Sequence, residues 1–153
     1  MKVLGIRTAP KQLRFALLES DGTNIVFLNQ NAEHIIKVPA GVTEVEDILH
    51  WQKSEVDRIL RQNQDIDLVA IKTSEYARSD TKSTRLASYL DAAVLLASKD
   101  ANIPVCTRLY SQIGAKRTDV KGRAESKVGS TDKYWNEQIA DAIMVAWALR
   151  GGI

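Results

Sequence analysis

The most apolar strand-like segment of the chain reads Asp67-Leu68-Val69-Ala70-Ile71-Lys72. The four central residues are all apolar, with no alternation between polar and apolar positions. A strand of this kind is typical of the interior of a sheet that is covered by helices on both faces. The segment therefore predicts an α/β protein in which helices enclose a sheet.

The residues before this segment predict a set of antiparallel strands. Three short apolar runs, each punctuated by turn signals, occupy residues 2–8, 12–19 and 24–29. The turn signals are Ala9-Pro10 and Asp21-Gly22. Strands joined by tight turns pair antiparallel, so these three runs are expected to be neighbours in the sheet.

A helix is predicted between the third run and the apolar segment. Thr43 and Glu46 have the spacing of a capping box, and apolar residues follow at helical spacing as far as Leu60, so the helix is expected to end near Arg61. The residues from 30 to 42 contain Pro39 and Gly41, and they are expected to form a loop.

The second half of the chain predicts a further helix, strand and helix. Helical periodicity covers residues 86–96 and 135–149, and a short apolar run at 103–107 predicts a fifth strand. A strand–helix–strand connection requires parallel pairing. We therefore expect one domain over residues 1–153: a mixed five-stranded sheet, formed by three antiparallel strands and then helix, strand, helix, strand and helix, with the helices packed on it.

Composition excludes several classes of protein. The net charge of +2 is too small to indicate nucleic-acid or membrane binding by itself, so such an argument requires local clusters of charge. The only cysteine, Cys106, cannot form an internal disulfide and is expected to be buried and inert. No apolar run is long enough to span a membrane, and the N-terminus does not resemble a signal peptide. We expect a cytoplasmic protein.

Three segments share a resemblance to one superfamily. They are Val3–Arg7, Asp67–Lys72 and Asn136–Ala146, the last of which contains Ala-Asp-Ala. They resemble the opening strand, the buried fourth strand and the last helix of ribonuclease H-like proteins, in particular the RuvC-type resolvases and short bacterial relatives. Val120–Val128 more weakly resembles a glycine- and lysine-containing segment of that family. The resemblance implies a ribonuclease H-like fold over nearly the whole chain.

The resemblance also implies where catalytic groups would lie. Enzymes of this family cut phosphodiesters with two divalent metal ions that are held by carboxylates. The family's acidic positions fall on Arg7, Lys72 and Gln138, and one aspartate is kept as Asp141. We therefore expect a non-catalytic domain without a metal centre or other cofactor, in which Arg7 or Lys72 forms an ion pair with Asp141, and which acts by binding nucleic acid or a protein partner.

Three alternatives remain open. The first is a nuclease that depends on Mg²⁺ or Mn²⁺, with a rearranged set of ligands drawn from Glu75, Glu137 and Asp141. In the second, Arg7 and Lys72 hold a phosphate group directly. The third is a structural protein that acts as a homodimer.

Basic residues cluster between residues 107 and 128. With two glycines among them, they predict a flexible loop that follows a phosphate backbone, although a solvated loop without a ligand has the same composition. The nucleic-acid-binding candidates are Lys116, Arg117, Lys121, Arg123 and Lys127.

Overall fold

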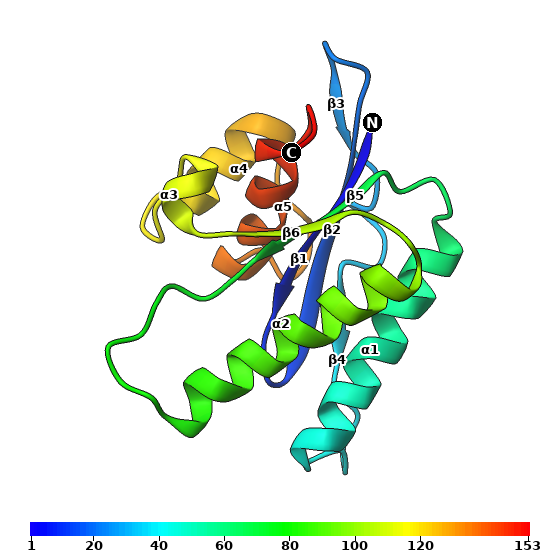
Figure 1. Cartoon of the computed structure of the whole chain (residues 1–153). Helices are drawn as coiled ribbons and strands as arrows, with labels where there is room; N and C mark the ends of the chain where they lie inside the picture. Colours follow the sequence, from blue (N-terminus) through cyan, green and yellow to red (C-terminus); the bar gives the residue numbers. More distant parts are fainter.

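The computed structural model describes all residues from 1 to 153, and it contains one mixed sheet. The strands run in the spatial order β3-β2-β1-β5-β6, with β4 beside β2 (Figure 1). Strand β2 is antiparallel to β1, β3 and β4, whereas β1, β5 and β6 are parallel. Their bounds are β1 Lys2–Thr8, β2 Gln12–Ser20, β3 Ile25–Phe27, β4 Ile35–Lys37, β5 Leu68–Lys72 and β6 Val105–Arg108.

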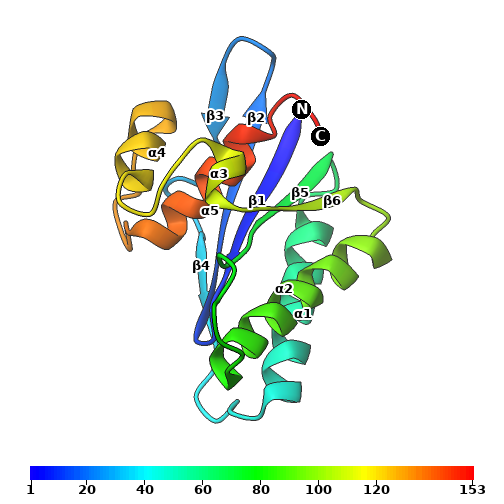
Figure 2. The same ribbon diagram turned by 60° about the vertical axis from the view of Figure 1, so that its left-hand side comes forward.

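Five helices complete the domain. Helices α1 and α2 cover one face of the sheet, and α5 covers the other face, with α3 and α4 beside it (Figures 1 and 2). No helix is both long enough and apolar enough to cross a membrane. The helices are α1 Val45–Gln62, α2 Lys82–Asp100, α3 Tyr110–Ile113, α4 Val120–Val128 and α5 Glu137–Ala148.

The predicted order of three antiparallel strands followed by helix, strand, helix, strand and helix is confirmed, but the predicted number of strands is wrong. The sheet has six strands, because residues 35–37 form β4 within the segment expected to be a loop. Strand β2 is nine residues long, and β3 pairs only with its second half. The first half is therefore free to pair with β4, a strand too short to show an alternating pattern.

Three local predictions are also wrong. Helix α1 is capped by Glu44 rather than Thr43, without a side-chain cap, and a capping box occurs instead at the start of α2, between Thr81 and Thr84. Helix α4 lies within the segment predicted to be a flexible loop, since Val120 and Ala124, one turn apart, are both buried. Cys106 is only partly buried, because its strand lies at the edge of the sheet.

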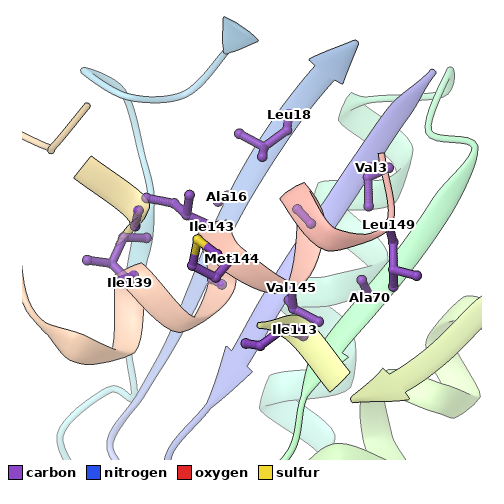
Figure 3. Packing of buried hydrophobic residues seen from close by; sticks show 14 of the residues in the cluster. Val3, Ala16, Leu18, Ala70, Ile113, Ile139, Ile143, Met144, Val145 and Leu149 are labelled. Carbon is purple, nitrogen blue, oxygen red and sulfur yellow. The ribbon is translucent and has the colours of Figure 1, made fainter. Parts of the chain in front are cut away.

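The strands divide their side chains between two cores. In β1, Leu4 and Ile6 pack toward α1 and α2, whereas Val3 packs toward α5. Figure 3 shows the second core, where side chains from three adjacent strands meet the buried side of α5. Because side chains alternate between faces, Arg7 lies on the same face as Val3, and Lys72 lies on the same face as Ala70.

Helix α5 lies unusually close to β1 at Gly5. A Cβ atom at this position would be 1.9 Å from the carbonyl oxygen of Ala142 and 2.9 Å from the Cβ atom of Ala146. Only glycine permits this approach. The contact places the first half of α5, including Asp141, against the carboxyl ends of β1 and β5.

Candidate functional site

Three basic side chains lie in a row across the sheet beneath α5. Arg7 is directly opposite Arg14 in the register of β1 and β2, and the pairing of Ile6 with Ile71 places Lys72 next along β5. We call Arg14, Arg7 and Lys72 the basic row. All three side chains are mostly buried, which is uncommon for basic residues and requires compensating partners.

Arg7 is compensated by Asp141. Its Nε atom donates to Asp141 Oδ2 at 3.1 Å, and its Nη1 atom donates to the carbonyl oxygen of Lys72 at 3.2 Å. The hydroxyl group of Tyr110 donates to the other oxygen of Asp141 at 2.8 Å. The predicted ion pair between Arg7 and Asp141 is thus present, and both oxygens of this buried carboxylate have a donor.

Burial raises the pKa of Asp141, while the Tyr110 hydroxyl and the two neighbouring cations, Arg7 and Lys72, oppose that effect. Burial and the hydrogen bond to Asp141 raise the pKa of Tyr110. Tyr110 therefore stays protonated at neutral pH and acts as a fixed donor.

Lys72 is fully buried and has a different partner. Its ammonium group donates to Glu75 Oε1 at 3.2 Å and to the carbonyl oxygen of Thr73 at 2.5 Å. It also lies 3.8 Å from the centre of the Tyr110 ring, which is a favourable cation–π distance. Burial lowers the pKa of Lys72, and its pairing with Glu75 opposes this shift.

Glu75 links Lys72 to the start of α3. Its Oε1 atom also accepts a hydrogen bond from the backbone N–H of Tyr110 at 2.8 Å. Burial acts to raise the pKa of Glu75, but the hydrogen bonds from Tyr110 and Lys72 outweigh it, and the pKa is lowered. Glu75 is therefore ionised at neutral pH and held by Lys72.

Arg14 differs from the other two members of the row, and it is not among the residues predicted from the sequence. Its Nη1 atom donates to Gln138 Oε1, its Nε atom is buried without a hydrogen-bond partner, and no carboxylate pairs with it. Burial, reinforced by the charge of Arg7, lowers the pKa of Arg14. The signal was available, because pairing the first two predicted strands around their tight turn places residue 14 opposite residue 7.

The candidate carboxylates do not form one cluster. Asp141 binds Arg7, Glu75 binds Lys72, and Glu137 accepts from Arg117 Nε at 3.0 Å. No group of three His, Cys, Asp or Glu side chains is placed to hold a metal ion. The residues present at the ends of β1 and β5 therefore do not fit a divalent metal centre.

The five basic candidates are exposed on and just before α4. Arg123 pairs with Asp119 at 3.0 Å, and the ammonium group of Lys127 lies 4.4 Å from the centre of the Trp147 ring. Lys116 and Lys121 form no ion pair. Lys121 also lines a polar hollow together with Arg14, which connects the exposed basic surface to the basic row.

A second buried acid, Asp91, lies on the opposite face of the sheet and was also missed. Thr8 Oγ1 donates to Asp91 Oδ1 at 2.6 Å, and burial raises the pKa of Asp91 to about 6. Asp91 lines a cleft of about 610 Å³ between α2 and the segments that follow β5 and β6. The sequence feature that could have indicated Asp91 is the position of an acidic residue near Leu90 and Val94, on the apolar side of a predicted helix.

Comparison with known proteins identifies the fold. No protein-family model matches the chain, and no curated protein sequence matches it. Among solved structures, RuvC from Thermus thermophilus in complex with a Holliday junction substrate matches with a TM-score of 0.80 at 18% identity, over 97% of this chain and 92% of that one. A structure of Thermus thermophilus RuvC matches with a TM-score of 0.77 at 18% identity, over 97% of this chain and 93% of that one.

The yeast mitochondrial Holliday junction resolvase Ydc2 matches with a TM-score of 0.54 at 10% identity, over 95% of this chain and 76% of that one. The predicted ribonuclease H-like fold of the RuvC type is therefore confirmed, over almost the whole chain. At these levels of identity, the likeness concerns the fold alone.

Proposed function

We propose that this chain is a non-catalytic protein of the RuvC fold that binds nucleic acid, and that a network of buried ion pairs stands where the enzymes of this fold hold metal ions. The observation that carries the proposal is the bond of Arg7 to Asp141 beside the fully buried Lys72. By the family resemblance, Arg7 and Lys72 occupy two acidic positions, and Asp141 occupies a third.

Electrostatics favours this interpretation over a rearranged metal site. A divalent cation at Asp141 would have to displace Arg7 and Tyr110, and it would then lie close to the positive charges of the basic row. Displacement would also leave a mostly buried guanidinium without its counterion, which is costly. Glu75 and Glu137 are each engaged by a basic side chain of their own.

Nucleic acid is the proposed partner for two reasons. RuvC from Thermus thermophilus, which matches this chain with a TM-score of 0.80, was solved in complex with a Holliday junction substrate. In this chain, the exposed basic side chains of α4 and the segment before it lie beside α5, next to the basic row. Exposed lysine and arginine side chains that neutralise phosphates supply most of the affinity of non-specific binding.

The absence of a metal centre is tested by calorimetry and by a cleavage assay. We expect no heat of Mn²⁺ binding and no cleavage of a four-way junction, duplex DNA or RNA, under conditions in which Thermus thermophilus RuvC serves as the positive control. Cleavage by this chain that is lost in Asp141→Asn would overturn the proposal and support the nuclease alternative.

Nucleic-acid binding is tested by fluorescence anisotropy at several salt concentrations. Replacing Lys116, Arg117, Lys121 and Arg123 together by Gln should reduce the salt slope for duplex DNA by about 3 to 4, if each of them contacts one phosphate. The matched control removes four exposed basic residues on or near α1 and α2: Arg61, Arg78, Lys82 and Lys99. An equal reduction of the salt slope in the two variants would show that binding depends only on net charge, and it would contradict the assignment of this surface as the binding site.

A second candidate function, a homodimeric structural protein, is favoured by exposed apolar side chains on α2. Tyr89, Leu95 and Leu96 expose 45%, 36% and 58% of their surface. If a second copy of the chain covers this region, light scattering should report a dimer that Leu96→Glu dissociates. A monomeric parent chain would exclude this candidate.

A further inference from the structure

Arg14 is the one member of the basic row that has only neutral partners. It is 6% exposed, yet its side chain contacts no carboxylate. Besides the Gln138 oxygen, the amide oxygen of Gln12 reaches Nη1 at 3.1 Å and Nη2 at 3.2 Å when that amide is turned toward the guanidinium. The Nε–H group has no acceptor at all.

A buried guanidinium without an anion is unfavourable, because its hydration is lost and no opposite charge replaces it. The neighbouring cations do not share this problem, since Arg7 has Asp141 and Lys72 has Glu75. Arg7 lies directly opposite Arg14 and adds repulsion. The row therefore has a deficit of negative charge at the Arg14 end.

A polar hollow of about 450 Å³ lies at this end of the row, and none of the residues that line it is hydrophobic. Two cations face it from different elements: Arg14 from β2 and Lys121 from α4. The first turn of α5 forms another wall. The six lining residues are Gln12, Arg14, Lys121, Asn136, Glu137 and Gln138.

The acidic residue in the hollow does not neutralise Arg14. Glu137 is bonded to Arg117 Nε at 3.0 Å, so its charge already has a partner. The side chain of Asn136 caps the backbone N–H groups of Gln138 and Ile139, so the helix end supplies positive potential rather than free donors. The charges that face the hollow thus have a positive excess, carried by Arg14 and Lys121.

We propose that this hollow is an anion site that binds one phosphate group, with the Arg14 guanidinium group and Lys121 Nζ as its donors. Phosphate fits because its tetrahedral oxygens accept hydrogen bonds from two directions and because arginine binds phosphate with strong charge-assisted bonds. The source of the phosphate is the backbone of a nucleic-acid strand, a step that rests on the proposed function. The loop predicted from the sequence consists of exposed lysine and arginine side chains, whereas this site is centred on a buried arginine.

The experiment records ¹H–¹⁵N NMR spectra of the arginine Nε–H groups during titration with inorganic phosphate, with a thymidine dinucleotide phosphodiester and with a DNA duplex. Sodium chloride at matched ionic strength is the control titrant. We expect a saturable shift of the Arg14 Nε–H signal with all three phosphate probes and none with chloride. Lys121→Gln should weaken each affinity about 5- to 10-fold, whereas Lys99→Gln, at the far end of α2, should leave it unchanged.

Arg14→Met identifies the signal and serves as a second variant. Because it removes an uncompensated buried charge, we expect it to fold at least as stably as the parent chain and to lose the response to phosphate. If Arg14→Met fails to fold, Lys121→Gln alone still decides the matter, since Lys121 is exposed on α4.

The outcomes separate this inference from the proposed function. A shift with inorganic phosphate but not with the dinucleotide or the duplex would establish an anion site and overturn the nucleic-acid source. DNA binding without any change at Arg14 would support the proposed function and overturn this inference. A chloride titration that reproduces the shift would overturn the inference as well.

Discussion

Asp141→Asn is the substitution that most directly tests the buried network. Asparagine has nearly the shape of aspartate, and its oxygen can still accept the hydrogen bond from Tyr110. The other carboxylate oxygen becomes an NH₂ group that faces Arg7 Nε, which was 3.1 Å from it. Two donors then oppose each other, and Arg7 loses its counterion.

The size of the effect follows from burial. Asp141 exposes 2% of its side chain and Arg7 exposes 17%. Removing one partner of a buried ion pair costs about 3 to 5 kcal/mol. Arg7 keeps its bond to the carbonyl oxygen of Lys72 and has some contact with water, so we expect about 3 kcal/mol, which for a domain of this size lowers Tm by about 6 to 12 °C.

Urea unfolding of a double-mutant cycle measures this effect. The cycle combines Asp141→Asn with Arg7→Met, and we expect a coupling energy of about 2 kcal/mol. Asp80→Asn is the control, because Asp80 and Arg85 form an exposed ion pair for which we expect less than about 1 kcal/mol. Two results would refute the assignment of a stabilising buried ion pair. One is a coupling energy near zero, and the other is a loss of unfolding free energy for Asp141→Asn that is no larger than that for Asp80→Asn.

Three further predictions concern buried positions around the site. Gly5→Ala should destabilise the fold by about 3 kcal/mol in urea unfolding, because the added methyl group overlaps the Ala142 carbonyl; a loss below about 1 kcal/mol would mean that α5 can withdraw. Since burial raises the pKa of Asp91 to about 6 from an ordinary value of 3.8, the folded state binds more protons than the unfolded state between these pH values, and this group's contribution to stability is lost as pH rises. The free energy of unfolding of Asp91→Asn should therefore rise by about 2 kcal/mol relative to that of the parent chain between pH 4 and pH 7, measured in a pH series of urea unfolding curves; a difference between the two proteins that does not change with pH would contradict this. Lys72→Met should leave Tm unchanged or raise it, because Glu75 exposes 47% of its side chain and can be hydrated once Lys72 is gone; a fall in Tm of more than about 5 °C would show that the ammonium group stabilises the fold.

Much of the fold follows from the sequence because hydrophobic periodicity is a local signal. The apolar run Leu68–Lys72 and the helix that contains Asp141 were both predicted close to their observed bounds. Strand β4 and helix α4 were missed for the same reason: each is short, so its pattern extends over too few residues to stand out.

The candidate site was predictable only in part. The ion pair of Arg7 with Asp141 was expected, because the resemblance aligned both positions with one site. The bonding of Lys72 to Glu75 and the contact of Lys72 with the Tyr110 ring depend on the path of the chain after β5 and β6. No sequence spacing encodes that path, since the two segments are 35 residues apart and meet only when the sheet has formed.

The glycine at position 5 has a consequence for how sequences of this fold can vary. Because the backbone of Ala142 and the methyl group of Ala146 fill the space above Gly5, helix and strand interlock, and neither can slide along the other. This contact therefore fixes the distance between residue 141 and the ends of the strands. We expect substitutions at positions 7 and 72 to leave this backbone contact unchanged, so that the chemistry beneath α5 can change without a change of architecture.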